Sequence, residues 1–327
     1  MSKNKIHSLI IGHKGQDGTL LQALLNQERV SWLGIDRSNI DVSGGLLLDL
    51  PEVIDIGSLE QVQEIVRKIN PEVIYYLAAY HCSSIARVQF SEQHFRSGLT
   101  VNVQGPLNFL EAIAKCSLKS KFLYVSSSLI YAAGASSDQP ITELNLLAPA
   151  ETYAFEKILA GHYCREYRDK YDVFASVVIP FNHESVYRPV GFFTRDVTDA
   201  IAQIRLGKRE CWEVGSLDTI VDWLYAGDVV RAMQLISKLD KADDFIVASG
   251  VGHTTGEFIK IACDYAGVDF TNAIRVNAKG FLRKNNSRVG DASKLKAMTG
   301  WQPAVGFSEL VKQLMQAAID RSLRSVE

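Results

Sequence analysis

Short apolar runs alternate with stretches of helical spacing through the first half of the chain. The first run, Ile6–Ile11, predicts a buried strand, and Gly18–Gln27 predicts a helix because its leucines fall on one stripe. The same alternation continues as far as residue 180. It predicts further strands at Val30–Ile35, Val73–Leu77, Phe122–Val125 and Val173–Ile179, and further helices at Glu60–Lys68, Val101–Ala114 and Tyr153–Tyr167.

Strands that alternate with helices of this length form βαβ units, in which the strands are parallel and the crossovers right-handed. Residues 1–180 therefore predict an α/β fold with a Rossmann-type, doubly wound parallel sheet. The alternation loosens in residues 181–327, where polar and aromatic segments separate helices predicted at Val197–Leu206, Gly227–Ser237 and Thr255–Tyr265. We expect this part to form a smaller C-terminal α/β lobe that returns in places to the sheet.

Charge and composition narrow the classes of partner. The chain has 35 Lys and Arg against 37 Asp and Glu, a balance that argues against a nucleic-acid-binding face. It has neither an apolar run of the roughly 18 residues that span a bilayer nor a signal-peptide pattern, so we expect no membrane association. The 5 cysteines form no C-x-x-C pair and the 7 histidines no H-E-x-x-H, which predicts a cytoplasmic protein without a metal site.

A glycine-rich loop, Gly12-His13-Lys14-Gly15-Gln16-Asp17-Gly18, joins the first predicted strand to the first predicted helix. Glycines at such a turn allow the backbone to approach a pyrophosphate, and the helix N-terminus presents unpaired N–H groups to the anion. The spacing is GxxGxxG rather than the commoner GxGxxG. Asp36 ends the second strand, where a carboxylate binds the adenosine ribose and favours NAD; Arg37 beside it is suited to the 2′-phosphate of NADP.

Three further residues form a candidate catalytic set. Tyr153 and Lys157 are four residues apart at the start of a predicted helix and therefore project from one face. An ammonium near a phenol lowers the phenol pKa from about 10 and makes it a usable acid or base. Ser127 follows the strand Phe122–Val125 at the carboxyl edge of the sheet, where it is placed to hold the reacting oxygen.

These residues, in their order and spacing, resemble the extended short-chain dehydrogenase/reductase family over nearly the whole chain. Within its nucleotide-sugar branch the sequence is most similar to GDP-mannose 4,6-dehydratases. The segments that carry this likeness are Gly15–Gly18, Phe181–Ser185, Asp222-Trp223 and Asp244–Gly250. Gly290–Lys294 and Gly300–Pro303 are also similar to GDP-4-keto-6-deoxymannose reductases.

The resemblance implies NAD or NADP in the N-terminal lobe, with NAD slightly favoured by Asp36, and a nucleotide-diphosphate sugar in the C-terminal substrate lobe. The positions that it assigns to the cofactor are Gly12, Gly15, Gln16, Asp17, Gly18, Asp36, Arg37, Asp55, Ile56, Leu77, Ala78, Ala79, Tyr153 and Lys157. It also implies a homodimer with a four-helix interface built from Val101–Ala114 and Tyr153–Tyr167. The side chains expected to supply its apolar contacts are Phe109, Leu110, Tyr163 and Tyr167.

One departure from the family pattern bears on the reaction. In the segment Ser126–Tyr131, Leu129 occupies the position of the dehydratases' catalytic Glu. An aliphatic side chain transfers no proton, so elimination of water should be slower by roughly 10²–10⁴-fold. Redox chemistry at sugar C4 needs only the serine, tyrosine and lysine, which favours 4-keto reduction or epimerisation. A genuine dehydratase would need a displaced base, for which Glu143, Glu184 and His183 are candidates.

A second departure concerns the substrate diphosphate. Family members often carry an Arg before Asp222-Trp223, where this chain has Val221. Cations that remain as candidates for the diphosphate are Arg188, Arg195, Arg283, Lys284 and Arg288. Further candidate substrate contacts are Asn182, His81 and Ser128. A third hypothesis is a dinucleotide-binding sensor without turnover, although binding alone does not require the whole catalytic set.

Overall fold

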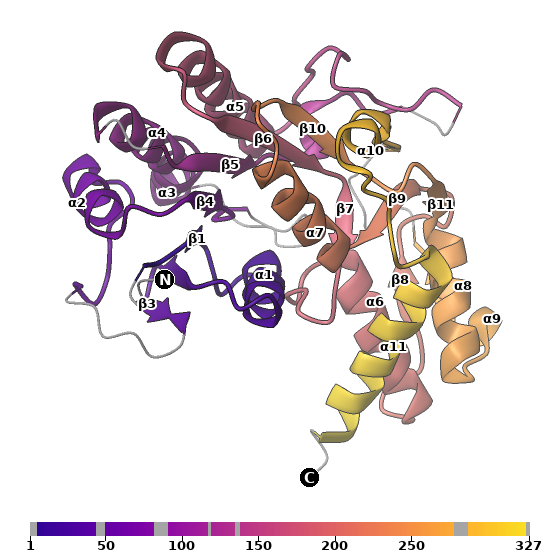
Figure 1. Ribbon diagram of the computed structural model, residues 1–327. Coiled ribbons are helices and arrows are strands. Elements are labelled where there is room, and N and C mark those ends of the chain that lie inside the picture. Colours follow the sequence, from indigo (N-terminus) through magenta and orange to yellow (C-terminus); the bar gives the residue numbers. More distant parts are fainter. Residues whose placement is uncertain are drawn as a thin grey trace.

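The computed structural model describes residues 5–43, 50–81, 91–116, 119–134, 138–277 and 287–324. Its centre is a seven-stranded sheet in the order β10-β6-β5-β4-β1-β2-β3, with helices on both faces (Figure 1). These strands are β1 (Ser8–Ile11), β2 (Trp32–Asp36), β3 (Asn39–Val42), β4 (Val73–Tyr76), β5 (Lys121–Val125), β6 (Ala175–Pro180) and β10 (Asp244–Val247). All pairs are parallel except β2 with β3. The predicted Rossmann-type α/β fold is therefore confirmed.

Two apolar layers enclose the sheet because its strands carry apolar side chains on both faces. Helices α2 (Leu59–Ile69), α4 (Gly105–Cys116) and α5 (Thr152–Tyr171) cover one face, with side chains such as Val62 and Phe109 in the core. Helices α1 (Gln16–Gln27) and α7 (Ala226–Ser237) cover the other, where Leu21 and Met233 are fully buried. Both layers hold the sheet rigid beneath its carboxyl edge.

A third apolar cluster lies in the C-terminal part of the chain. It is built from α6 (Phe193–Arg205), α8 (Thr255–Ala266), α9 (Phe270–Ala273) and α11 (Phe307–Arg324), which Figure 1 places beyond the main sheet. The small strands beside them are β7 (Asn182–Glu184), β8 (Trp212–Val214), β9 (Ile220–Tyr225), β11 (Gly252–Thr254) and β12 (Ile274–Val276). Strand β10, which comes between α7 and β11 in the chain, returns to the main sheet beside β6, and α10 (Ser293–Thr299), which follows β12, packs near it.

The predicted helix Val101–Ala114 is not regular. After α3 (Glu92–Leu99), residues Thr100–Gln104 form a π-helical segment, η2, and only then does α4 begin. The Tyr76 hydroxyl donates to the Val101 carbonyl at 2.6 Å and so takes an acceptor from the helix. Pro106, inside the predicted helix, lacks the N–H that an α-helix would use there.

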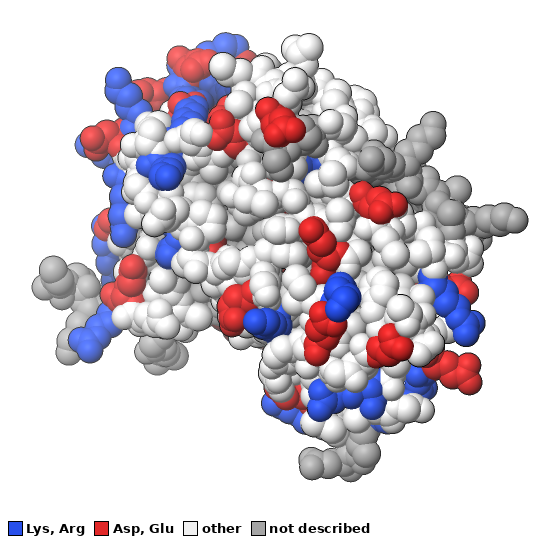
Figure 2. Space-filling model, turned by 90° about the vertical axis from the view of Figure 1, so that its right-hand side faces the viewer, with Lys and Arg blue, Asp and Glu red and all other residues white. Residues whose placement is uncertain are grey.

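The carboxyl ends of β1, β4, β5 and β6 meet along one edge of the main sheet, because these strands are parallel neighbours. The loops that leave this edge contain the glycine loop, Leu77–His81, Ser126–Ser128 and Phe181–Ser185. On the face shown in Figure 2, acidic and basic side chains are interspersed rather than gathered by sign. Within the described residues, no helix is both long and apolar enough to cross a membrane.

Candidate active site

The glycine loop is packed too tightly for larger residues. Gly12 has a left-handed backbone (φ 87°), and a Cβ there would lie 2.7 Å from the backbone nitrogen of Ala78, at the end of β4. A Cβ on Gly18 would lie 2.6 Å from the Gly12 carbonyl oxygen. Gly15 is the N-cap of α1 and has no side chain to offer its first N–H groups. The loop is therefore close-packed at the N-terminus of α1, an arrangement that suits an anion; its role in binding the cofactor stays a prediction.

The end of β2 carries the two residues predicted to discriminate between NAD and NADP, Asp36 and Arg37. Asp36 is the last residue of the strand and pairs with Asn39 across a tight connection to β3. Arg37 and Ser38 in this connection are exposed, and the Lys14 ammonium donates to the Ser38 hydroxyl at 3.3 Å. Lys14 is a cation that sequence reasoning missed, since only folding brings the glycine loop beside this turn.

Two more predicted cofactor segments lie in connections next to the loop. Asp55 is exposed and accepts from the Gly57 backbone N–H at 2.9 Å, and Ile56 follows it before α2. Leu77–Ala79 leave the end of β4, where Ala78 contacts Gly12.

Tyr153 and Lys157 lie in the first turns of α5, against the end of β5. The Lys157 ammonium, 1% exposed, donates to the Val125 carbonyl at 2.8 Å, two residues before Ser127. It also lies 5.6 Å from the Tyr153 ring centroid. The Ser127 hydroxyl accepts from the Leu129 backbone N–H at 3.2 Å and caps the short 3-10 turn η3 (Ser128–Ile130). The structure thus packs the helix of the tyrosine and lysine onto the strand that leads into the serine.

The ionisation of this set differs from the expectation. Burial raises the pKa of Tyr153, and the carboxylates of Asp17 and Glu156 raise it further, while Arg188 opposes them. Burial lowers the pKa of Lys157 to about 7. The pKa of Tyr153 is thus raised, not lowered as expected from the nearby ammonium, because desolvation is the largest effect on it.

A buried polar network stands behind the tyrosine and lysine. Asn102, in η2, donates to the Glu156 carboxylate at 2.7 Å and brackets Tyr80 by bonds of 2.9 Å to its backbone N–H and carbonyl. Burial raises the pKa of Glu156, and the Asn102 bond opposes this shift. Asn102 therefore fixes the segment Tyr80–His81 beside α5. The irregular helix is what lets it reach both partners, and Pro106 was the sequence signal for that irregularity.

Aromatic and cationic side chains line one side of Tyr153. The His81 ring meets the Tyr153 ring edge-on with centroids 4.5 Å apart, and Phe192 stacks on His81 at 6.1 Å. The Arg188 guanidinium lies 4.7 Å from the centroid of Phe192. His81 and Arg188, both predicted to bind substrate, are thus joined through Phe192, which sequence reasoning did not identify.

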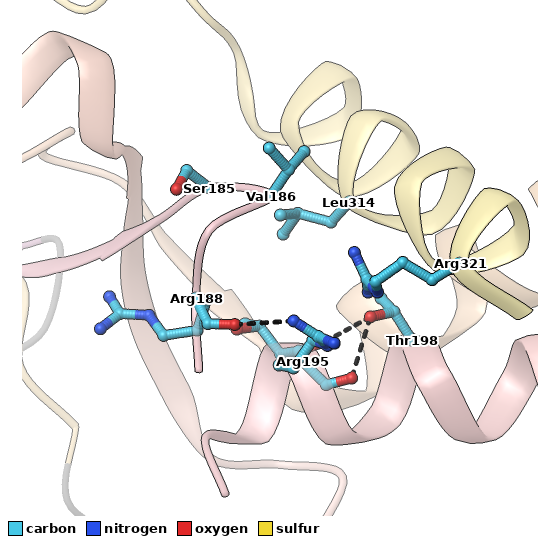
Figure 3. A pocket seen from close by; sticks show the side chains of 8 residues that line it. Ser185, Val186, Arg188, Arg195, Thr198, Leu314 and Arg321 are labelled. Atoms are coloured by element: carbon cyan, nitrogen blue, oxygen red, sulfur yellow. Dashed lines mark hydrogen bonds between the residues drawn. The ribbon is translucent and has the colours of Figure 1, made fainter. Parts of the chain in front are cut away.

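The other predicted cations are placed differently. Arg195 donates to Asp199 at 2.5 Å and to the Arg188 carbonyl at 3.0 Å, beside a cavity of only about 10 Å³ between α6 and α11. In Figure 3 its guanidinium faces Arg321, whereas the Arg188 guanidinium points away from this cavity. Arg195 is therefore part of the helix packing in this structure. Arg283 and Lys284 lie outside the described residues.

Arg288 lies near the segment Ser126–Tyr131 and beside Val221, the position where family members often carry an arginine. It is 8% exposed, its backbone is bridged to that of Val221, and its Nε donates to the Tyr131 carbonyl at 3.1 Å. Asn182 is exposed in β7, and Ser128 is buried in η3. The Arg288 backbone is thus paired with the position where family members often have an arginine, while its guanidinium is held at the Tyr131 carbonyl.

The three candidate displaced bases all have partners. Glu143 accepts from the Ile246 backbone N–H at 2.8 Å. The buried Glu184 carboxylate accepts from Arg188 at 2.8 Å and from the Thr194 hydroxyl at 2.6 Å. His183 bonds to Asp17, with Nε2 and Oδ2 3.1 Å apart. Leu129 itself is partly exposed in η3.

The expected dimer contacts need a correction. Phe109 and Leu110 are 0% exposed and Tyr167 is 8% exposed, so these three face the sheet or its edge rather than a partner. The large apolar or aromatic side chains that α5 presents to solvent are instead Phe155, Leu159 and Tyr171. The error arose because an apolar stripe in the sequence does not distinguish a core face from an interface. Within the described ranges, no cluster of three or more potential metal ligands is found.

Comparisons with known proteins agree with this architecture. The model of the family described as GDP-mannose 4,6 dehydratase matches residues 9–314. GDP-mannose 4,6 dehydratase 2 of Arabidopsis thaliana is 31% identical, covering 97% of this chain and 88% of the relative, and the human GDP-mannose 4,6 dehydratase is 28% identical, covering 98% and 93%.

Solved structures show the same fold. RMD from Pseudomonas aeruginosa, complexed with NADPH, has a TM-score of 0.79 at 24% identity and covers 96% of this chain and 99% of its own. UDP-glucose 4-epimerase from Thermotoga maritima, with UDP-glucose, has a TM-score of 0.77 at 21% identity, covering 98% and 100%. The family match over residues 9–314, together with the relative that is 31% identical, places the chain in the GDP-mannose 4,6-dehydratase family.

Proposed function

We propose that this protein is an NAD(P)-dependent oxidoreductase acting at C4 of a nucleotide-diphosphate sugar, as a 4-keto reductase or an epimerase. In this proposal residues 1–180 hold the dinucleotide and residues 181–327 the sugar nucleotide, with a GDP-sugar favoured by the family. The observation that carries it is the packing of Tyr153 and Lys157 against the strand leading into Ser127, combined with Leu129 where related dehydratases have a glutamate.

The residues of the glycine loop and the β2 turn fit a dinucleotide. The cradle at Gly12 and Gly18 leaves no room for a Cβ, and the N-terminus of α1 offers donors to a diphosphate. Asp36 suits the ribose hydroxyls of NAD, while Arg37 and Lys14 suit the 2′-phosphate of NADP. When bound, the nicotinamide would supply or accept the hydride at sugar C4.

Side chains of this protein then orient the oxygen on sugar C4 and supply its proton. In the reductive direction, the carbonyl oxygen gains negative charge as C4 gains the hydride, and the Tyr153 hydroxyl donates its proton to that oxygen. Ser127 donates a hydrogen bond to the same oxygen. Lys157 then stabilises the resulting tyrosinate. The raised pKa of Tyr153, caused by burial and by Asp17 and Glu156, supports its role as a proton donor at neutral pH.

On the substrate side, Arg288 is the best-placed cation for the diphosphate. Its backbone is bridged to Val221, the position where relatives often carry an arginine. Arg188, His81 and Asn182 are proposed to contact the sugar or its phosphates from the opposite side, because Arg188 and His81 lead through Phe192 to Tyr153.

A genuine 4,6-dehydratase is the second candidate, favoured by the identity with curated dehydratases. It requires a base other than Leu129, and each of Glu143, Glu184 and His183 is held by a partner. A sensor without turnover would not need the buried Lys157, whose desolvation is unfavourable for folding.

One set of incubations tests these candidates. The protein is mixed with GDP-mannose or with a 4-keto-6-deoxy GDP-sugar, together with either reduced or oxidised dinucleotide, and reduced nicotinamide absorbance and product mass are followed. Consumption of reduced cofactor by the keto sugar is expected and should disappear in Tyr153→Phe. Loss of water from GDP-mannose without consumption of cofactor would instead identify a dehydratase. Conversion of a sugar to its C4 epimer, separated by chromatography without change of mass or net use of cofactor, would identify an epimerase, whereas tight dinucleotide binding without any of these changes would identify the sensor.

We also propose that the protein is a homodimer through α4 and α5. Phe155 is 59% exposed and Leu159 is 39% exposed, one turn apart on α5. An exposed apolar pair of this kind on one helix face is typical of a protein interface. The reduced cysteines Cys116, Cys164, Cys211 and Cys263 support a cytoplasmic location.

A further inference from the structure

A group of polar contacts joins the first turn of α1 to strand β7 and the residue after it. The Gln16 amide donates to the His183 carbonyl at 3.1 Å and accepts from the Ser185 hydroxyl at 2.9 Å. Beside it, Oδ2 of Asp17 lies 3.1 Å from Nε2 of His183. We call these four residues the clasp. It connects the glycine loop to a segment more than 160 positions away that begins the C-terminal half of the site.

The contacts of His183 define its charge. Its Nδ1 is 2.8 Å from the Phe181 carbonyl, and its Nε2 faces the Asp17 carboxylate. Both partners are acceptors, so both ring nitrogens donate, and the ring is an imidazolium. Burial disfavours this charge, but the Asp17 carboxylate outweighs it, and the pKa of His183 is raised.

Burial and the charged groups around this ring shift the pKa values of Asp17, His183 and Tyr153. Burial raises the pKa of Asp17, but the His183 cation outweighs burial, and the net shift is downward. Arg188, in the loop after β7, also lowers the pKa of Asp17 and opposes the charge on His183. Asp17 raises the pKa of Tyr153, on α5, and Arg188 lowers it. The mutual attraction of Asp17 and His183 thus favours the charged form of each.

The position of Asp17 makes this pairing important for an anionic ligand. It is the second residue of α1, where the N–H groups of the first turn receive the diphosphate in a Rossmann-type fold. An unpaired carboxylate in that turn is attracted to the same N–H groups and repels the diphosphate. In the clasp, the carboxylate is instead directed towards β7 and its charge is balanced.

We propose that His183 is a positioning residue for the dinucleotide: its imidazolium draws the Asp17 carboxylate away from the N-terminus of α1 and balances its charge, so that the diphosphate binds there. This inference rests on the proposed function, because it assumes that the dinucleotide occupies the glycine loop. It extends that function by making cofactor binding depend on a residue of the sugar-binding half. Cofactor affinity is then set by β7 as well as by the glycines.

The test measures dinucleotide affinity of the full chain without any sugar, from the fluorescence of reduced nicotinamide. His183→Gln, which keeps a hydrogen-bond donor but loses the charge, is expected to weaken binding by roughly 10- to 100-fold. Adding Asp17→Asn to that variant removes the unbalanced carboxylate and should restore affinity to within about 3-fold of wild type. His7→Gln is the matched control, because His7 pairs with Glu72 before β1, at the amino end of the strand.

A pH series separates this role from a merely structural one. Wild-type affinity should fall as pH rises through the raised pKa of His183, whereas the double variant should show no such step. Unchanged affinity in His183→Gln, or a double variant as weak as the single one, overturns the inference. Turnover distinguishes the two proposals: a wild type that binds the dinucleotide but transforms no sugar refutes only the proposed reaction.

Discussion

Lys157 is predicted to reduce the stability of the fold in which it acts. Burial lowers its pKa from 10.5 to about 7, so the native state holds this proton less strongly than the unfolded chain. A difference of about 3.5 between the two pKa values corresponds to on the order of 5 kcal/mol of folding free energy near neutral pH. Replacing the lysine by methionine, which has a similar length and no charge, removes this penalty.

Part of the gain is offset by lost contacts. The Val125 carbonyl loses the donor 2.8 Å away, and the Tyr124 ring loses a cation 4.8 Å from its centroid. An unsatisfied buried acceptor costs about 1–3 kcal/mol. Lys157→Met is therefore expected to be more stable than wild type by about 2–4 kcal/mol and to have no measurable turnover.

Urea unfolding at neutral pH and thermal melts measure the stability, and reduced nicotinamide absorbance measures the turnover. Wild-type stability should also rise from about pH 7 towards pH 10, since the unfolded lysine keeps a proton that the native state releases; this slope should vanish in Lys157→Met. Lys121→Met is the matched control. It loses bonds to two carbonyls, of Ser237 and Leu239, outside the site and should be destabilised. A Lys157→Met protein that is destabilised as much as the control, or that retains turnover, would refute the reasoning.

Three further predictions concern other parts of the molecule. Leu129→Glu should introduce a base beside the sugar and raise the rate at which GDP-mannose loses water by about 10²-fold or more, measured by product mass. Leu129→Gln, which cannot act as a base, should leave that rate unchanged. Equal rates in the two variants would contradict the assigned position of this residue. Burial opposes the charges of Asp17 and His183, yet their attraction lowers the pKa of the first below 3.8 and raises that of the second above 6.5. The pair thus contributes fully between these values and less as pH rises further, so urea melts should give a larger stability loss for His183→Gln near pH ~5.5 than near pH ~9. Phe155→Glu with Leu159→Glu should convert a dimer to a monomer in sedimentation experiments without unfolding it, and an unchanged mass would exclude this face as the interface.

Local sequence signals predicted most of the main sheet. The strands from Ile6–Ile11 to Val173–Ile179 and their helices were placed within a few residues, because an apolar run or stripe buried against a sheet is a local property. The position of Gly12–Gly18 between β1 and α1 followed for the same reason. The strands β7, β8, β11 and β12 have three residues each, too few for a period to be visible, and their pairings join distant segments.

Which charges neutralise one another was decided only by the tertiary structure. The sequence determined that Tyr153 and Lys157 share a helix face, since four residues complete about one turn. It did not determine their pKa values, which depend on how much water the packing of α5 against β5 removes. It likewise presented Asp17 and His183 as unrelated positions, whereas chain folding makes them a partly buried ion pair at the N-terminus of α1. Spacing along the chain sets local geometry; desolvation and long-range contacts set the chemistry.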